Sequence, residues 1–191
     1  FVSTSTFQMA DNFYYFAYGS TLDFKSFEAW ATQHGEEIPQ WSEIPISRAR
    51  LQGYSLVFDV PSKYWGGAVA TIEPNPSSFV EGVAIQLKSN QRAMLDRKEG
   101  VQTGLFQPLS VHVDLLGNGD AAPTTVEAVA FEANPSRRDP AKNTQPSEKY
   151  IHAIIVGAKD RNLSEEWINH LSSFIQQKET TTASSSSKDN Q

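Results

Sequence analysis

The segment from Tyr14 to Leu22, YYFAYGSTL, constrains the fold more than any other part of the chain. Its aromatic residues favour a strand in a packed sheet, and Gly19 can adopt backbone angles that other residues avoid. Ser20 and Thr21 are candidate N-caps for a following helix. A strand, a turn and a helix start leave several N–H groups unpaired and pointing the same way, which suits an anion or a developing oxyanion. The same pattern also fits a strand-to-helix turn that binds nothing.

Length and composition limit the class of protein. With 191 residues, 39% of them hydrophobic and 20% charged, the chain fits one globular domain. We expect a flexible segment over residues 1–12, a single domain over 13–178 and a disordered Ser/Thr-rich tail over 179–191. A formal net charge of −6 argues against nucleic-acid binding, and no apolar run is long enough to span a membrane. Because the first residues lack a signal-peptide pattern, a cytoplasmic location is expected.

The order of the expected elements predicts an α+β fold in which a curved sheet surrounds a core and helices lie outside. Besides the strand at Tyr14, strands are expected over residues 48–58, 65–72, 80–87, 106–116 and 125–132. A turn over 74–78 is expected to separate two of these strands, and 134–146 to form a long exposed loop. Ser147 and Ser164 are expected to cap the last two helices.

The sequence gives no sign of a metal or a cofactor. The absence of Cys excludes thiolate ligands, disulfides and cysteine nucleophiles. No phosphate-binding loop, dinucleotide fingerprint or nucleophile elbow is present. The four histidines have no metal-ligand spacing; they are His34, His112, His152 and His170.

Glu99 is the candidate for acid–base chemistry. It lies in the sequence LDRKEGV, where a helix from about Ser89 is expected to end, with Gly100 after it. The negative end of the helix dipole disfavours a charged carboxylate, which suits a group that must exchange a proton. The alternative is an exposed Glu that forms an ion pair with Lys98 or Arg97.

Four blocks in order along the chain resemble the γ-glutamylcyclotransferase family: YFAYGS at 15–20, WGGAVATI at 65–72, LDRKEGV at 95–101 and PSEKYI at 146–151. The resemblance extends from about Tyr14 to Leu171 and implies a curved mixed β-sheet or barrel with flanking helices, and no cofactor. It also implies cleavage of a γ-glutamyl amide by its own α-amine, which gives 5-oxoproline and a free amine or amino acid. The implied partner is a small-molecule γ-glutamyl substrate, and a homodimer is left open.

The resemblance also implies roles for individual residues. Glu99 matches the family's catalytic Glu, which takes a proton from the substrate's α-ammonium and delivers it to the departing amine. Tyr150 matches a tyrosine expected to reach the substrate. The residues expected to line the pocket and bind the glutamyl moiety are Tyr15, Phe16, Ala17, Tyr18, Gly19, Ser20 and Thr21.

Two positions depart from the family pattern. Family members commonly have Asn where this chain has Thr21, and a Tyr expected after the Gly104 turn is Phe106 here. Both changes leave Glu99 in place but bear on the leaving group. Three hypotheses therefore stay open: a γ-glutamylcyclotransferase, a related enzyme for a γ-glutamyl amine or glutathione-derived conjugate in specialised metabolism, and a binding protein without turnover.

Overall fold

The structure is a computed structural model that describes residues 12–117, 123–141 and 144–185. Within these residues the strands are β1 (Asn12–Ala17), β2 (Ile46–Ser62), β3 (Gly67–Lys88), β4 (Phe106–Leu115) and β5 (Thr124–Ala133). The α-helices are α1 (Phe24–His34), α2 (Arg92–Lys98), α3 (Glu148–Asp160) and α4 (Glu165–Ser185). Short 3-10 turns are η1 (Ser20–Leu22), η2 (Trp41–Glu43), η3 (Ser89–Gln91), η4 (Val101–Thr103) and η5 (Pro135–Arg137).

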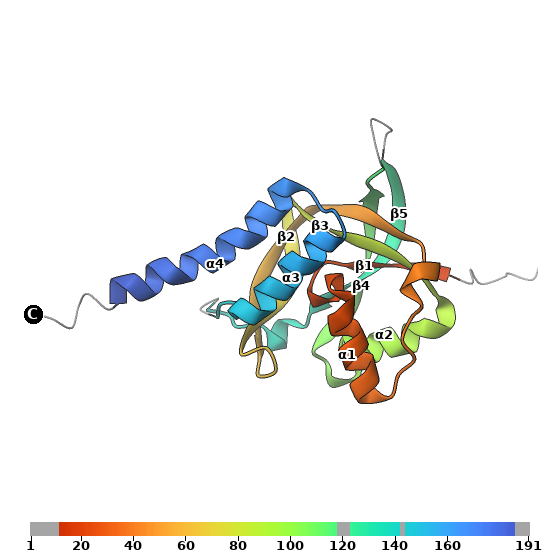
Figure 1. Cartoon of the computed structure of the whole chain (residues 1–191), viewed down its shortest axis with the longest axis horizontal. Helices are drawn as coiled ribbons and strands as arrows, with labels where there is room; N and C mark the ends of the chain where they lie inside the picture. Colours follow the sequence, from red (N-terminus) through yellow and green to blue (C-terminus); the bar gives the residue numbers. More distant parts are fainter. Residues whose placement is uncertain (1–11, 118–122, 142–143, 186–191) are drawn as a thin grey trace, which may run out of the picture.

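The strands form a closed barrel in the order β1-β3-β2-β4-β5 (Figure 1). Neighbouring strands are antiparallel except β1 and β5, whose parallel pairing joins Tyr14 to Ala128 and Tyr15 to Val129 and closes the barrel. Closure gives the edge strands hydrogen-bonding partners. The mixed barrel with surrounding helices confirms the predicted α+β fold.

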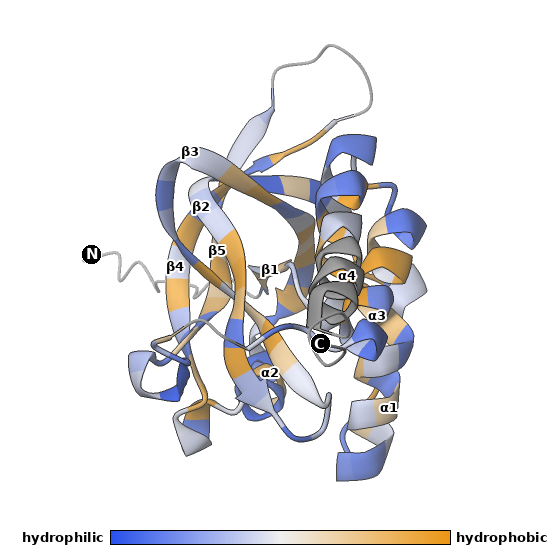
Figure 2. Cartoon of the chain, turned by 90° about the vertical axis from the view of Figure 1, so that its left-hand side faces the viewer, coloured by the Kyte–Doolittle hydropathy of each residue, from blue (hydrophilic) through white to orange (hydrophobic). Residues whose placement is uncertain are grey.

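The apolar core extends from the strands to the helices around the barrel. Helices α1, α3 and α4 lie on one side of the barrel, with α3 and α4 packed against each other (Figure 2). Large side chains that are 2% exposed or less come from both layers, among them Phe27, Ile72, Ile85, Phe131 and Ile154. The aromatic and β-branched residues that favour strands therefore also supply the core that holds the helices in place.

Three predicted helix ends are confirmed. The Ser147 hydroxyl accepts a hydrogen bond from the backbone N–H of Tyr150 at 3.2 Å, which caps α3. The Ser164 hydroxyl accepts one from the N–H of Trp167 at 3.1 Å at the start of α4. Gly100 has a φ of 67° directly after the C-cap of α2, the left-handed conformation that ends many helices.

The close approach of α3 to η1 depends on Gly157. A Cβ at this position would lie 2.3 Å from the carbonyl carbon of Leu22 and 2.4 Å from the backbone nitrogen of Asp23. Because Gly157 has no side chain, the backbone of α3 rests directly on the backbone at the end of η1. This contact fixes where the turn lies relative to the helix.

The predicted role of the turn residues as helix caps is wrong. Asp23 caps α1, since its carboxylate accepts a hydrogen bond from the N–H of Lys25 at 3.2 Å. Ser20 and Thr21 lie one turn earlier, within η1 itself. Gly19 has a φ of −102°, so the turn does not need a left-handed residue at this position.

The predicted turn over residues 74–78 is also wrong, because β3 runs through it as one strand. The register between β2 and β3 shifts between Gln52 and Tyr54, and Tyr54 pairs with Pro74. The Asn75 side chain accepts from the N–H of Ser77 at 3.1 Å. Residues typical of turns thus form an irregularity within the strand, where Pro is tolerated.

The described part of the segment over 134–146 is a loop with many exposed residues, as predicted, and it is also tied to the barrel. Arg138 forms ion pairs with the buried Asp59 at 2.6 Å and with Glu73 at 2.7 Å. The carbonyl of Gln145 accepts from the N–H of Ala68 at 2.8 Å. Buried ion pairs and backbone hydrogen bonds to β2 and β3 tie this segment down. Residues 142 and 143 lie outside the described part.

Helix α4 runs to Ser185 and so includes residues 179–185, which were predicted to belong to the disordered tail. The sequence QQK just before this stretch favours helix, and adding residues to an existing helix costs less than starting one. Residues 186–191 of the predicted tail and residues 1–11 of the predicted N-terminal segment lie outside the described residues. No helix in the described ranges is both long and apolar enough to cross a membrane.

Candidate active site

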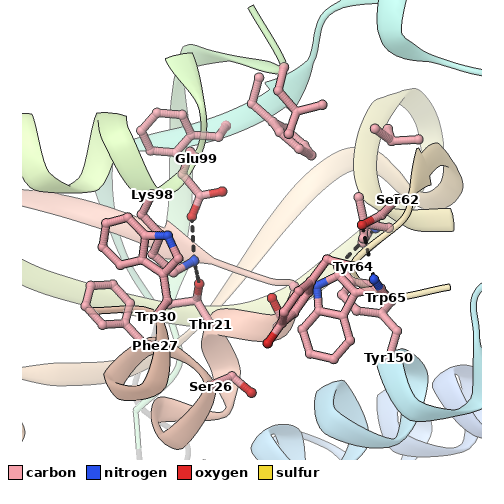
Figure 3. Close-up of a pocket in the computed structure, with 18 of the residues that line it drawn as sticks. Thr21, Ser26, Phe27, Trp30, Ser62, Tyr64, Trp65, Lys98, Glu99 and Tyr150 are labelled. Atoms are coloured by element: carbon pink, nitrogen blue, oxygen red, sulfur yellow. Dashed lines mark hydrogen bonds and ion pairs between the residues drawn. The ribbon is translucent and has the colours of Figure 1, made fainter. Parts of the chain in front are cut away.

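A cavity of about 480 Å³ lies between η1, α1, the C-terminal end of α2, the β2–β3 connection and α3. Figure 3 shows two facing walls. The first, called the Glu99 wall here, carries Thr21, Phe27, Trp30, Lys98 and Glu99. The second, the Trp65 wall, carries Ser62, Tyr64, Trp65 and Tyr150.

Glu99 is the C-cap residue of α2, and the left-handed Gly100 then turns the chain away from the helix axis. The Glu99 side chain is 16% exposed. Its Oε1 accepts a hydrogen bond from the Tyr15 hydroxyl at 3.1 Å and from Lys98 Nζ at 3.0 Å. Oε2 has no protein partner in the described part of the chain, so this oxygen is available to a ligand in the cavity.

Lys98 belongs to the site, although the sequence presented it merely as an ion-pair partner for an exposed Glu. Its ammonium donates to Thr21 Oγ1 at 2.6 Å as well as to Glu99 at 3.0 Å, and its side chain is 11% exposed. The ammonium also lies 5.3 Å from the ring centroid of Phe27. The ion pair therefore exists, but inside the cavity. Arg97 instead turns outward and pairs with Glu36 at 2.6 Å.

Three buried tyrosines surround the carboxylate. Burial raises the pKa of the Tyr15, Tyr18 and Tyr150 hydroxyls, and the negative charge of Glu99 raises it further. The Tyr18 hydroxyl donates to the carbonyl of Phe131. The Tyr150 hydroxyl accepts from the N–H of Ala70 at 3.1 Å. All three hydroxyls stay protonated over the range in which most enzymes work.

The η1 turn leaves two N–H groups out of its own hydrogen bonds, close to the Tyr150 hydroxyl. Its internal hydrogen bonds are donated by the N–H groups of Leu22 and Asp23, at 3.0 and 3.1 Å. The N–H groups of Ser20 and Thr21, at the start of the turn, have no partner within it. The predicted donors are therefore present at the edge of the cavity, at two positions.

Known proteins are similar to this chain in sequence and in fold. Residues 79–171 match the AIG2-like family, a range that includes Glu99 and Tyr150. The chain is 29% identical over 171 residues to the γ-glutamylcyclotransferase of Bos taurus, covering 87% of this chain and 81% of that protein. The Mus musculus γ-glutamylcyclotransferase is 27% identical over 164 residues, covering 84% and 77%. A solved γ-glutamyl cyclotransferase superposes with a TM-score of 0.69 and 25% identity, covering 84% of this chain and 86% of that one. The chain is therefore similar to γ-glutamylcyclotransferases both in sequence and in fold.

The structure brings together most of the site residues that the family resemblance implied. Those that line the cavity are Tyr15, Tyr18, Gly19, Ser20, Thr21, Glu99 and Tyr150. Phe16 and Ala17 do not line it, contrary to prediction, and both are fully buried. Side chains alternate along a strand, so Phe16 points to the other face of β1 from Tyr15. Ala17 packs against β3, where Gly82 has no side chain to obstruct it.

Sequence reasoning missed the aromatic residues that α1 and the β2–β3 connection bring to the cavity. Trp30 comes from α1, and Tyr64 and Trp65 come from the connection. A signal lies beside Trp65, because a glycine pair such as Gly66-Gly67 permits the close approach of another backbone. A Cβ on Gly67 would lie 2.5 Å from the backbone nitrogen of Ser147, so that approach is to the start of α3. Phe106, where the family pattern has Tyr, also lines the cavity.

The ionisable groups of the cavity suit proton transfer rather than metal binding. In the parts of the chain that the structure describes, no three His, Asp or Glu side chains are placed to hold a metal ion together. Glu99 has a cation and a phenol as its partners. Among its described lining residues, the cavity therefore offers the Glu99 carboxylate, the Lys98 ammonium and several neutral donors.

Proposed function

We propose that this protein is a γ-glutamylcyclotransferase that acts on γ-glutamyl amides and releases 5-oxoproline and a free amine or amino acid. The observation that carries the proposal is the position of Glu99. Its carboxylate faces the cavity, is held by Tyr15 and Lys98 and keeps Oε2 free. The names of the bovine and mouse relatives support the same reaction class.

The reaction needs one group that moves protons between two nitrogens. Glu99 takes a proton from the substrate's α-ammonium, and the freed amine attacks the γ-carbonyl carbon. A new C–N bond closes the five-membered ring as the bond to the leaving nitrogen breaks. The attacking nitrogen loses two protons in all and the leaving nitrogen gains two, so the carboxylate returns to its starting state. Because the attack is intramolecular, holding the glutamyl chain folded supplies much of the acceleration.

Neutral donors around the cavity can stabilise the oxyanion that forms at the γ-carbonyl. The N–H groups of Ser20 and Thr21 have no partner within η1. The Tyr150 hydroxyl lies next to this turn, 3.4 Å from the position a Cβ on Gly19 would take. Its raised pKa keeps its proton in place, so it can act as a donor.

The Trp65 wall favours a bulky or aromatic leaving group as a second candidate. Tyr64 is 71% exposed at the mouth, and the Trp65 ring packs edge-on against Tyr150 with centroids 4.9 Å apart. Phe106 adds a further apolar surface where the family pattern has a hydroxyl. These side chains would accommodate a glutathione-derived conjugate of specialised metabolism better than a small polar amino acid.

The test is the release of 5-oxoproline from γ-glutamyl dipeptides, a γ-glutamyl amine and glutathione conjugates. Glu99→Gln keeps the shape of the side chain and removes the proton acceptor, so we expect activity to fall on the order of 10²- to 10⁴-fold. Glu127→Gln, at an exposed position of β5, serves as the matched control and should stay active. Tight binding without product in the parent protein would indicate a binding protein instead.

A preference within the same panel decides between the two leaving-group candidates. Faster turnover of bulky conjugates than of simple γ-glutamyl dipeptides would support the second candidate. Equal or faster turnover of the dipeptides would contradict it.

A further inference from the structure

The Glu99 wall presents two opposite charges from adjacent residues to the same cavity. We propose that Lys98 and Glu99 together bind the zwitterionic head group of the substrate, with Lys98 on the α-carboxylate and Glu99 on the α-amino group. We call this pair the head-group clamp. The inference rests on the proposed function and adds a substrate-binding role for Lys98.

The Lys98 ammonium is held in the cavity wall by the protein. Thr21 Oγ1 accepts from it at 2.6 Å and Glu99 Oε1 at 3.0 Å, while the ring of Phe27 lies 5.3 Å away. An ammonium has three N–H donors, and these two hydrogen bonds use two of them. The third is available to a ligand, because Lys98 lines the cavity.

The clamp matches the charges of a γ-glutamyl substrate. The α-carbon of the glutamyl moiety carries a carboxylate and an ammonium side by side, and the clamp offers a cation and an anion side by side. Binding would exchange the internal pair between Lys98 and Glu99 for two pairs with the substrate. No charge is then left unpaired in a site where both side chains are more than four-fifths buried.

A substrate carboxylate beside Glu99 alone would face a like charge at short range. Lys98 removes this repulsion, which explains why a cation lies next to the proton acceptor. As Lys98 turns toward the α-carboxylate, Glu99 loses part of its positive neighbour and accepts a proton more readily. The same movement therefore binds the substrate and prepares the carboxylate for proton transfer.

The N–H groups of Ser20 and Thr21, which make no hydrogen bond within η1, offer a different place for the α-carboxylate. In that arrangement Lys98 acts on Glu99 alone and has no contact with the substrate. The two arrangements differ in one measurable respect: with direct contact the preference for an α-carboxylate is lost without Lys98, whereas a carboxylate held by the N–H groups keeps most of that preference.

The experiment compares two substrates in each variant: an L-γ-glutamyl dipeptide and the same compound with its α-carboxylate converted to a carboxamide. For the parent protein we expect kcat/KM to favour the carboxylate by roughly 10- to 100-fold, the range for a hydrogen bond to a charged group. In Lys98→Met and Lys98→Gln this ratio should fall to within about threefold of unity. Because both substrates are measured on one variant, a general loss of activity cancels in the ratio.

Arg97→Met is the matched control. It removes a positive charge from the neighbouring residue, which is 43% exposed and pairs with Glu36 outside the cavity. The substrate ratio of Arg97→Met should equal that of the parent protein. A parental ratio in Lys98→Met, or a collapsed ratio in Arg97→Met, would overturn the clamp.

Binding measurements separate this inference from the proposed function. Calorimetry with the two compounds is carried out on Glu99→Gln and on Glu99→Gln combined with Lys98→Met. A carboxylate preference that is present in Glu99→Gln and lost in the double variant supports the clamp. This holds even where the parent protein releases no 5-oxoproline, a result that would refute the proposed function alone. A preference that persists in the double variant refutes the clamp, whatever the turnover of the parent protein.

Discussion

Gly157→Ala tests whether the contact between α3 and η1 positions the site. The new Cβ would lie 2.3 Å from the carbonyl carbon of Leu22 and 2.4 Å from the nitrogen of Asp23. Nonbonded carbons approach to about 3.5 Å, so the helix and the turn must separate by roughly 1 Å. Both neighbours are backbone atoms, which no change of rotamer can move.

The magnitude follows from two opposing effects. Overpacking costs about 1–3 kcal/mol, and replacing Gly by Ala within a helix returns up to about 1 kcal/mol. We therefore expect the free energy of unfolding to fall by up to about 2 kcal/mol, and Tm by up to roughly 8 °C. Thr21, which holds Lys98, lies next to the displaced Leu22. A displacement of about 1 Å in a site can cost on the order of 10²-fold in rate.

Two assays measure these effects: denaturant unfolding followed by circular dichroism, and 5-oxoproline release. Gly117→Ala is the control, since a Cβ at Gly117 would meet nothing within 4 Å. The control should retain both the stability and the kcat/KM of the parent protein. A Gly157→Ala variant whose free energy of unfolding rises by about 1 kcal/mol and whose activity is unchanged would refute the reasoning. That result is expected only where the helix glycine has free space around it.

Three further predictions concern the cavity. Tyr150→Phe should lower the free energy of unfolding by about 1–3 kcal/mol, because it leaves the buried N–H of Ala70 without its acceptor. Tyr64→Phe, at an exposed tyrosine, should change the free energy of unfolding little. Equal effects of the two variants in denaturant unfolding would contradict this prediction. Because burial raises the pKa of three cavity tyrosines, their stabilising contribution is complete below about pH 10 and is lost as the pH rises further. Above about pH 10, the free energy of unfolding should fall by up to about 4 kcal/mol per pH unit. Tyr15→Phe should reduce this slope by roughly a third. An unchanged slope in Tyr15→Phe would refute the prediction. Thr21→Val removes an acceptor of the Lys98 ammonium and should lower kcat/KM for γ-glutamyl dipeptides by about tenfold. Thr21→Ser keeps the hydroxyl and should retain the parental kcat/KM. Equal kcat/KM values for the two variants would show that this hydrogen bond is dispensable.

Local signals in the sequence predicted much of the fold. Serine caps at Ser147 and Ser164 and the left-handed Gly100 depend on short-range chemistry, and all three are confirmed. The position of Glu99 at the end of α2 followed from the same kind of signal. The four sequence blocks, in their order, added the family resemblance and with it the expectation of a curved sheet or barrel, which no single block specifies.

Features that depend on distant contacts could not be predicted in this way. The sequence presented Lys98 as a partner for an exposed Glu, because nothing near it indicates that Thr21 lies 2.6 Å from its ammonium. Phe16 and Ala17 were placed in the site because a block of sequence does not show which strand face turns inward. The stretch over 74–78 was predicted to be a turn from its composition, yet pairing with β2 extends the strand through it.

The parallel pairing of β1 with β5 has a consequence for how the protein acquires activity. Tyr14 pairs with Ala128, which comes 114 positions later in the sequence, and the Tyr150 side chain that completes the cavity follows later still. Closing so long a loop carries a high entropic cost, so barrel closure belongs among the slow steps of folding. During synthesis, Glu99 leaves the ribosome well before the strand that closes the barrel and the helix that supports η1. Catalytic competence should therefore arise in one step late in folding, and fragments that end before α3 should be inactive.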